Sequence, residues 1–312
     1  MMGVENDRWG ILYCPKREIS HTQRRWEKIQ RFLEENKVNF DFVQSENSNS
    51  VERLMCMLIN NGYKTIIIVG GDSALNDAVN CLMSVDKEVR DSISLGVIPN
   101  GVLNDFARYW EFSEGNVHQT VSWLVAHRIR KIDLGCLHYI NKDGKPCKRY
   151  FLNCVNIGLI AAIMNLRRQT RSLLGSRTLS FLVSMLLLIF QRLEYKMDII
   201  INNDNIKRRV MTVCIGSARG YGQTPNAVPY NGLLDVSVVY HPEVMQLIEG
   251  FWLLLWGRFL NHRSVHSYRT SKVEIKEANH AHIGLDGRLM RDLRCPISID
   301  INQEVINFLI PE

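Results

Sequence analysis

Two short segments carry residue types that could hold a phosphate group. In each, an apolar run ends at glycine, and asparagine and aspartate follow within a few positions. The run over 66–69 leads into Gly70, Gly71, Asp72, Ser73 and Asn76, and the run over 95–98 leads into Gly101, Asn104 and Asp105. Glycine lets backbone N–H groups approach an anion closely, and the start of a helix adds a favourable dipole. The two segments therefore predict a phosphate site.

The acidic residues in these segments point to a metal ion as well. Asp72 and Asp105 would repel a bare polyphosphate, so their presence implies a bridging Mg²⁺. Asn76 and Asn104 could donate hydrogen bonds to the ligand, or could tie each turn to its own backbone. The first segment alone also fits an ordinary turn, with Asp72 or Ser73 as helix N-cap. The presence of two such segments favours nucleotide binding.

The elements expected around these segments alternate between strands and helices. We expect strands over 9–13, 40–44, 65–69 and 94–98, and helices over 20–36 and from about 51, 75 and 103. The apolar residues at 51, 54, 55 and 58 have the spacing of one helix face. Such alternation is typical of a parallel, doubly wound sheet, in which ligands bind at the carboxyl ends of the strands. Both glycine segments would then lie at that edge.

After about residue 130 the pattern changes to strands joined by short turns. We expect strands over 195–202, 205–217, 233–240, 272–276, 282–286, 296–302 and 305–310, with helices near 178–193 and 243–260 as insertions. Mostly antiparallel strands indicate a β-sandwich-like domain. The predicted fold is thus α/β: a doubly wound parallel-sheet domain over 1–130 that binds nucleotide, and an antiparallel β-rich domain over 131–312 for the substrate.

The motifs resemble those of a known family. The first segment is similar to Gly-Gly-Asp-Gly-Thr-x-Asn-Glu, and the second to Pro-x-Gly-Thr-x-Asn-Asp-Phe-Ala, of the diacylglycerol kinase catalytic-domain family. That family includes bacterial lipid kinases and sphingosine kinases. The likeness continues in Asn231–Val236, similar to Asp-Gly-x-Leu-Asp-Val, and in Asp286-Gly287-Arg288, where members usually have Asp-Gly-Glu. Motif order and spacing agree over residues 9–311.

The resemblance implies an ATP-dependent lipid kinase that transfers a phosphoryl group to a diacylglycerol- or sphingoid-like hydroxyl. Its implied cofactors are ATP and Mg²⁺. The nucleotide would be held by Gly70, Gly71, Asp72, Ser73, Asn76, Gly101, Asn104 and Asp105, with Asp72 and Asp105 as the metal ligands. An NAD kinase-like enzyme with a soluble substrate is an alternative, because the glycine-aspartate motif fits that group too.

Four positions depart from the family pattern. Ser73 and Ala74 replace Gly-Thr, and Val102 replaces Thr, so two hydroxyl groups that could contact phosphate are lost. Arg288 replaces the glutamate that bacterial lipid kinases of the family are thought to use as general base. Arginine stays protonated and cannot take a proton from a lipid hydroxyl.

Two interpretations of Arg288 follow. By resemblance to sphingosine kinases, Asp72 would be the base and Arg288 would steady the transferred phosphate or a lipid headgroup. Asp286 is a third catalytic candidate, and its simpler role is that of a turn residue. Alternatively the base is lost, and the protein is a degenerate kinase that binds nucleotide or lipid without turnover.

Composition indicates which partners and which cell compartment to expect. The net charge of +6 suits a nucleotide or an anionic membrane surface and is too small to argue for nucleic acid. Eight scattered cysteines without a Cys-x-x-Cys pair favour a reducing cytosol. The apolar stretches 179–190 and 251–260 are too short to span a bilayer. We expect a cytoplasmic protein, or one bound peripherally to the inner face of the membrane. Whether it forms a homodimer is left open.

A basic run and two tryptophans could serve such a membrane contact. The run comprises Arg167, Arg168, Arg171 and Arg177. Basic residues beside aromatic ones suit an anionic lipid surface. A solvated arginine face is an equal alternative, and for Trp252 and Trp256 we favour a buried pair. Paired histidines at 262 and 266 and at 280 and 282 lack further ligands in register, so zinc is not expected there.

Overall fold

The computed structural model describes residues 8–15, 19–47, 49–101, 104–174, 194–220, 222–240, 258–291 and 293–311, with a few positions between 246 and 256. The chain divides into two compact units: Met1–Ile132 with Glu304–Glu312, and Asp133–Gln303. The first boundary lies two residues from the expected one. The return of the last residues to the first unit was not expected, and it follows from the pairing of the final strand described below.

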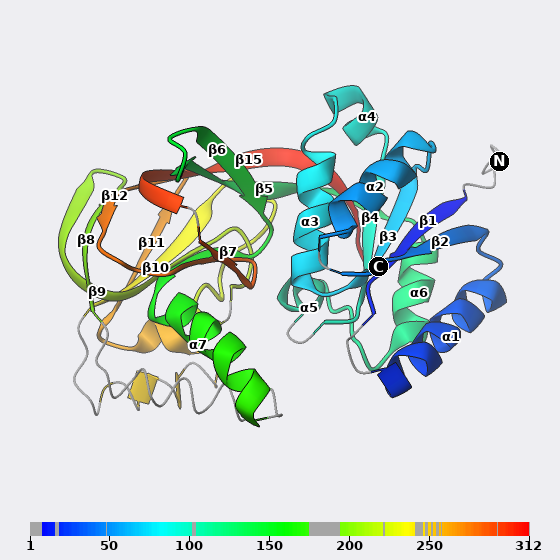
Figure 1. The fold of residues 1–312 in the computed structure, drawn as a ribbon, viewed down its shortest axis with the longest axis horizontal. Coiled ribbons are helices and arrows are strands. Elements are labelled where there is room, and N and C mark those ends of the chain that lie inside the picture. The colour runs from blue at the N-terminus through cyan, green and yellow to red at the C-terminus, as the bar shows by residue number, and fades with distance from the viewer. Residues whose placement is uncertain are drawn as a thin grey trace. The chain divides into compact units, whose positions relative to one another are not determined.

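The first unit is a parallel sheet with helices between its strands (Figure 1). Its strands are β1 (Trp9–Tyr13), β2 (Phe40–Gln44), β3 (Thr65–Gly70) and β4 (Ser94–Pro99). Its helices are α1 (Ile19–Glu35), α2 (Val51–Asn60), α3 (Asp72–Leu82), α4 (Lys87–Asp91), α5 (Asp105–Tyr109) and α6 (Val117–Val125). The strand order β4-β3-β1-β2 confirms the predicted parallel sheet.

Local sequence explains why these elements form and where they end. Every residue of β3 and β4 is buried, as expected for apolar strands covered on both faces. In α2 the buried residues are Val51, Leu54, Met55, Leu58 and Ile59, which form one helix face. Strands β3 and β4 pair in parallel with Gly70 beside Pro99. The two glycine segments therefore begin side by side at one sheet edge.

The second unit is built from antiparallel strands. They are β5 (Ile129–Asn141), β6 (Pro146–Phe151), β7 (Cys154–Gly158), β8 (Tyr195–Ile201), β9 (Asp204–Gly216), β10 (Leu234–Tyr240), β11 (Val265–Thr270), β12 (Lys272–Ala278), β13 (Ile283–Leu285), β14 (Arg288–Met290) and β15 (Leu293–Leu309). The helix α7 (Leu159–Leu174) follows β7, and the short helix η1 (Phe259–Asn261) precedes β11. Side chains from most of these strands form one aliphatic core. The β-rich second domain is thus confirmed.

Strand β15 explains the division of the chain. Its residues 297–300 pair antiparallel with β12 of the second unit, while Asn307 and Phe308 pair in parallel with β4 of the first. The two strands expected over 296–302 and 305–310 are therefore one continuous strand. Strands β5, β6, β7, β11 and β14 were not predicted. The helix expected over 178–193 lies outside the described residues, as does most of the one over 243–260.

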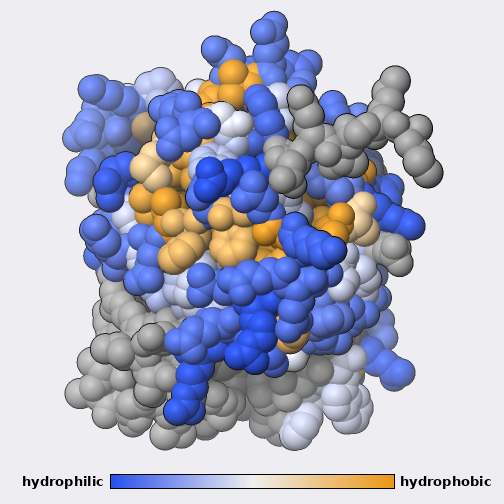
Figure 2. All heavy atoms as spheres, turned by 90° about the vertical axis from the view of Figure 1, so that its right-hand side faces the viewer, coloured by the Kyte–Doolittle hydropathy of each residue, from blue (hydrophilic) through white to orange (hydrophobic). Residues whose placement is uncertain are grey.

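Apolar side chains are exposed at two places on the surface. Figure 2 shows apolar side chains gathered on the face that carries β2 and α1, among polar ones. Trp252 and Trp256 are 54% and 70% exposed, with ring centroids 6.4 Å apart, so the expected buried tryptophan pair is wrong. Within the described part of the chain, no helix combines the length and the apolar character needed to cross a bilayer.

Candidate functional site

The two glycine turns of the first unit touch through their backbones. Gly71 is the N-cap of α3, and Gly101 follows the end of β4. A Cβ on Gly71 would lie 2.8 Å from the Gly101 Cα, and a Cβ on Gly101 would lie 2.5 Å from the Gly71 Cα. Side chains essentially never fit at such distances, so glycine is needed at both positions for the turns to meet. This packing is a second reason for glycine, beside the approach to an anion.

Asp72 joins the first turn to the helix of the second. Its Oδ2 accepts a hydrogen bond from the N–H of Asp105 at 2.9 Å, and its Oδ1 accepts one from the N–H of Phe106 at 3.2 Å. These N–H groups belong to the first turn of α5, where no helical carbonyl can accept them. The Asp72 carboxylate therefore fixes the start of α5 and brings the Asp105 backbone next to itself. Asp72 and Asp105 are both half-buried.

The asparagines of the two segments make hydrogen bonds within the protein. Asn104 has a left-handed backbone (φ 53°), its Oδ1 accepts from the Gly101 N–H at 2.8 Å, and its Nδ2 donates to the Gly101 carbonyl at 3.3 Å. Asn76 is 2% exposed, and its Oδ1 accepts from Asn80 Nδ2 at 3.2 Å. The contacts of Asn104 tie the second turn to its own backbone, whereas the Asn76–Asn80 contact lies within α3.

Asn100 and Arg25 hold the second turn, and the motifs gave no sign of either. The Asn100 N–H donates to the Gly70 carbonyl at 2.8 Å, and its Nδ2 donates to the Cys14 carbonyl at 3.0 Å. Asn100 thus connects the ends of β1, β3 and β4. Arg25 donates from α1 to the Pro99 carbonyl at 2.8 Å. Burial lowers the pKa of Arg25, and the Glu114 carboxylate 4.0 Å away opposes that shift.

Of the substituted positions in the glycine segments, the structure describes the two in the first segment. Ser73 lies exposed in the first turn of α3, so its Cβ points to solvent and does not crowd the backbone. Ala74, where the family has threonine, is buried. Val102 lies outside the described residues. The Ser73 hydroxyl is therefore available at the helix start, and no hydroxyl stands at position 74.

In the second unit Asp286 is a buried acceptor. Its side chain is 1% exposed. Its Oδ2 accepts from the Leu152 N–H at 2.7 Å, and its Oδ1 accepts from the N–H groups of Asn153 and Cys154 at 2.9 and 3.0 Å. The carboxylate thus satisfies three consecutive N–H groups in the link between β6 and β7. This geometry is that of a positioning residue and leaves little access for a substrate hydroxyl.

Arg288 is carried by the hairpin that Asp286 anchors. It opposes Leu285 in the β13–β14 pair and is half-buried.

The Asn231–Val236 motif also has a local structural role. The Gly232 N–H donates to Asp133 Oδ2 at 2.7 Å, with Gly232 at φ 71°, and Asp235 pairs with Arg269 at 2.7 Å. The motif therefore shapes the turn into β10.

Gly101→Ala is expected to lower the free energy of unfolding by about 1–3 kcal/mol, because the new methyl group overpacks the junction with Gly71. Chemical denaturation of the purified variant measures this. The matched control is Gly115→Ala in the same unit, where the nearest heavy atom to an added Cβ lies 3.7 Å away. Equal stability of the two variants would contradict the close contact between the turns.

Comparison with known proteins identifies the family. The family model for the diacylglycerol kinase catalytic domain matches residues 8–137, and the model for the YegS C-terminal NAD kinase beta sandwich-like domain matches residues 153–309. The chain belongs to the diacylglycerol kinase catalytic-domain family. The two matches cover the two glycine turns and the Asp286–Arg288 hairpin, so the recognition made from the motifs is confirmed.

Relatives of this family are similar at low identity. A diacylglycerol kinase of Bacillus subtilis is 20% identical over 72% of this chain and 71% of that protein, and one of Mycobacterium tuberculosis is 22% identical over 82% and 79%. The match to YtlR of Bacillus subtilis, named as a lipid kinase, is 25% identical over 50% of this chain and spans only 49% of that protein. The names of these relatives agree with the family assignment.

Solved structures share the fold. The crystal structure of a diacylglycerol kinase from Bacillus anthracis has a TM-score of 0.67 at 14% identity, and the alignment covers 97% of each chain. Yeast NADH kinase, complexed with NADH, has a TM-score of 0.52 at 10% identity over 97% of this chain and 84% of that one. At these identities the likeness is one of fold.

Proposed function

We propose that the protein is an ATP-dependent lipid kinase that transfers the γ-phosphate to a hydroxyl of a diacylglycerol- or sphingoid-like lipid. The observation that carries the proposal is the Asp72 carboxylate, which joins the two glycine turns by accepting the N–H groups of Asp105 and Phe106. Membership of the lipid kinase family supports the reaction class.

The phosphate groups would lie at the start of α3. The first N–H groups of a helix point along its axis without helical acceptors, and an anion there also meets the favourable end of the helix dipole. The Gly71 backbone and the exposed Ser73 hydroxyl are at this position. The chain's own groups thus bind and orient the phosphate, which is what phosphoryl transfer chiefly requires.

The donor set at this position fits Mg²⁺. Carboxylate oxygens are ligands that Mg²⁺ prefers. Asp72 and Asp105 would hold the ion. When bound, it would neutralise charge on the phosphate oxygens. Without it, two aspartates beside an anion site would repel the nucleotide.

Asp72 is also our choice of general base. The resemblance to sphingosine kinases implies this role, and Asp72 is only half-buried at the start of α3. Asp286 suits the role less well, because it is buried and already accepts three N–H groups. Its part would be to position the hairpin that carries Arg288. The Arg288 guanidinium would bind a phosphate or lipid headgroup through its planar set of donors.

The protein would bind its lipid substrate at a membrane surface. Trp252 and Trp256 are exposed and lie one helical turn apart, and the chain has a net charge of +6. Exposed aromatic rings with basic surroundings favour the interface of an anionic bilayer. The basic residues Arg167, Arg168 and Arg171 lie on α7, whose side chains there are outside the described residues.

The chief alternative is a degenerate kinase, and the substitution Arg288→Glu separates it from a working enzyme. In a working enzyme a carboxylate at this position would repel the γ-phosphate, so we expect lipid phosphorylation to fall by about tenfold or more. The measurement is steady-state phosphorylation of one lipid panel by both forms. Activity gained by the variant over an inactive wild type would support the degenerate-kinase interpretation and refute the proposed role of Arg288.

A further inference from the structure

Three side chains with metal-binding atoms meet on one face of the second unit. Cys136 and His138 are alternate residues of β5, so they project to the same side of the strand. Asp300 lies on β15, which pairs with β5. His138 Nε2 is 3.0 Å from Asp300 Oδ2, and one ligand atom from each of the three residues lies within 4.8 Å of the others.

We propose that Cys136, His138 and Asp300 bind a divalent transition metal ion of the zinc type. Thiolate, imidazole and carboxylate are the ligands zinc takes, at about 2.0–2.3 Å, which places neighbouring ligand atoms roughly 3.5 Å apart in a tetrahedron. The observed spacing needs only a small closure to reach this geometry. The soft thiolate favours zinc over Mg²⁺, so the site is distinct in chemistry from the aspartates of the first unit.

Charge around the cluster suits a cation. Cys136 is 1% exposed, and its sulfur lies within 4.8 Å of the ligand atoms of His138 and Asp300. A bound metal ion would replace the thiol proton, and the thiolate and carboxylate together would then match its two charges. Lys148 opposes binding, because it pairs with His138 across β5 and β6 and lies near Cys136. Its Nζ is held 5.5 Å from the Tyr150 ring centre.

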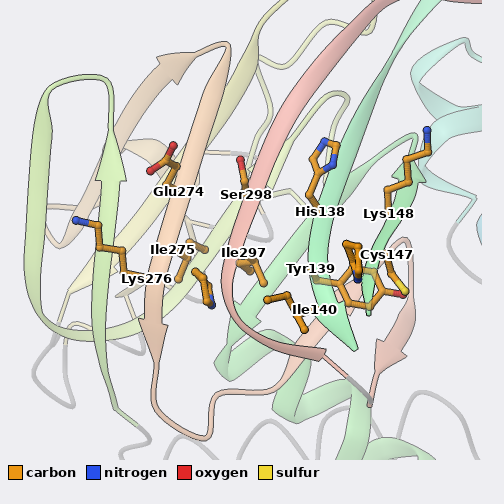
Figure 3. Close-up of a pocket in the computed structure, with 12 residues that line it drawn as sticks. His138, Tyr139, Ile140, Cys147, Lys148, Glu274, Ile275, Lys276, Ile297 and Ser298 are labelled. Atoms are coloured by element: carbon orange, nitrogen blue, oxygen red, sulfur yellow. The ribbon is translucent and has the colours of Figure 1, made fainter. Parts of the chain in front are cut away.

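The cluster has an open side. His138 lines a cavity of about 520 Å³ together with Lys148, Glu274 and Ser298. In Figure 3 the side chains of these four residues all extend toward the top of the view. The His138 and Asp300 side chains are 44% and 38% exposed, so a water molecule from solvent would complete a coordination shell that has three protein ligands.

The metal would link two strands that are distant in sequence. Cys136 and His138 come from β5 and Asp300 from β15, and both strands continue into the first unit. A ligand bound only by the folded chain raises its stability in proportion to the logarithm of ligand concentration. The inferred role is therefore a structural clamp on this pair of strands, independent of the kinase chemistry proposed above.

Titration of metal-free full-length protein with Co²⁺ tests the site, because a cysteine thiolate bound to Co²⁺ gives an intense near-ultraviolet absorption band. We expect one ion per chain, with a band that Zn²⁺ abolishes by displacing the Co²⁺. Cys136→Ser should remove the band. His138→Ala, at a partly exposed residue whose loss spares the core, should weaken affinity by about tenfold or more. The matched control is Cys147→Ser, which removes a thiol that lines the same cavity but lies outside the cluster.

Thermal unfolding gives a second measure. Zn²⁺ should raise the midpoint of the wild type and of Cys147→Ser, and raise that of His138→Ala by a smaller amount at the same Zn²⁺ concentration. Absence of a stoichiometric band in the wild type would overturn the proposal, as would a band that persists in Cys136→Ser or equal Zn²⁺ stabilisation of His138→Ala. Lipid phosphorylation is not a readout here, so failure of the kinase proposal would leave this test intact.

Discussion

Asp72→Asn is expected to reduce lipid phosphorylation by about 10²-fold or more, the range for loss of a general base. The amide cannot accept a proton from the lipid hydroxyl, and it is a weaker ligand for Mg²⁺ than a carboxylate. Its NH₂ group would also face one of the two N–H donors of α5, so the hydrogen bond from Asp105 or Phe106 is lost. Loss of the base and weaker binding of Mg²⁺ would both slow phosphoryl transfer.

Steady-state rates at saturating ATP and lipid, with a circular dichroism check of folding, measure this loss. Asp91→Asn is the matched control, because it makes the same chemical change at an exposed carboxylate of the first unit. It should keep the rate of the wild type. A folded Asp72→Asn variant that is as active as Asp91→Asn would exclude Asp72 both as base and as necessary metal ligand.

Asp286→Ala should lower the free energy of unfolding by about 3 kcal/mol or more, since each buried N–H left without an acceptor costs about 1–3 kcal/mol. The N–H groups of Leu152, Asn153 and Cys154 would all lose their partner at once. The β13–β14 hairpin, which carries Arg288, would lose its anchor. Activity should therefore fall together with stability.

Urea denaturation of the wild type and the variant provides the measurement. The control is Asp143→Ala in the exposed turn between β5 and β6, for which a change within about 0.5 kcal/mol is expected. If Asp286→Ala unfolds at the same urea concentration as Asp143→Ala, the anchoring role is wrong. Loss of activity without loss of stability would instead restore Asp286 as a catalytic candidate.

The fold of the first unit could be predicted because its signals are local. Fully apolar strands such as 65–69 and 94–98 alternate with helices whose buried faces have a regular spacing, and both patterns survive in the structure. The parallel pairing of Asn307 with Ser94 could not be predicted, because it joins residues far apart in the sequence. Strand β5 was missed because its first residues are exposed and charged and only its middle is buried.

The positions of the two glycine segments could be predicted, and the contacts within them only in part. The glycine segments do lie side by side, as a parallel sheet requires. That Gly71 and Gly101 touch, and that Asp72 caps α5, depends on backbone geometry that no motif encodes. Arg25 was missed because it lies on α1, distant in sequence from both segments. Asn100, next to Gly101, could have been found by asking which side chain holds the turn.

The central claim is phosphoryl transfer from ATP to a lipid hydroxyl, and mass analysis of the lipid product tests it most directly. The full chain is incubated with ATP labelled in the γ-phosphate, Mg²⁺, and anionic vesicles that contain diacylglycerols or sphingoid bases. The account predicts that one lipid class gains a single labelled phosphoryl group, at a rate that Asp72→Asn lowers by about 10²-fold or more. A folded protein that binds ATP but labels no lipid would contradict it.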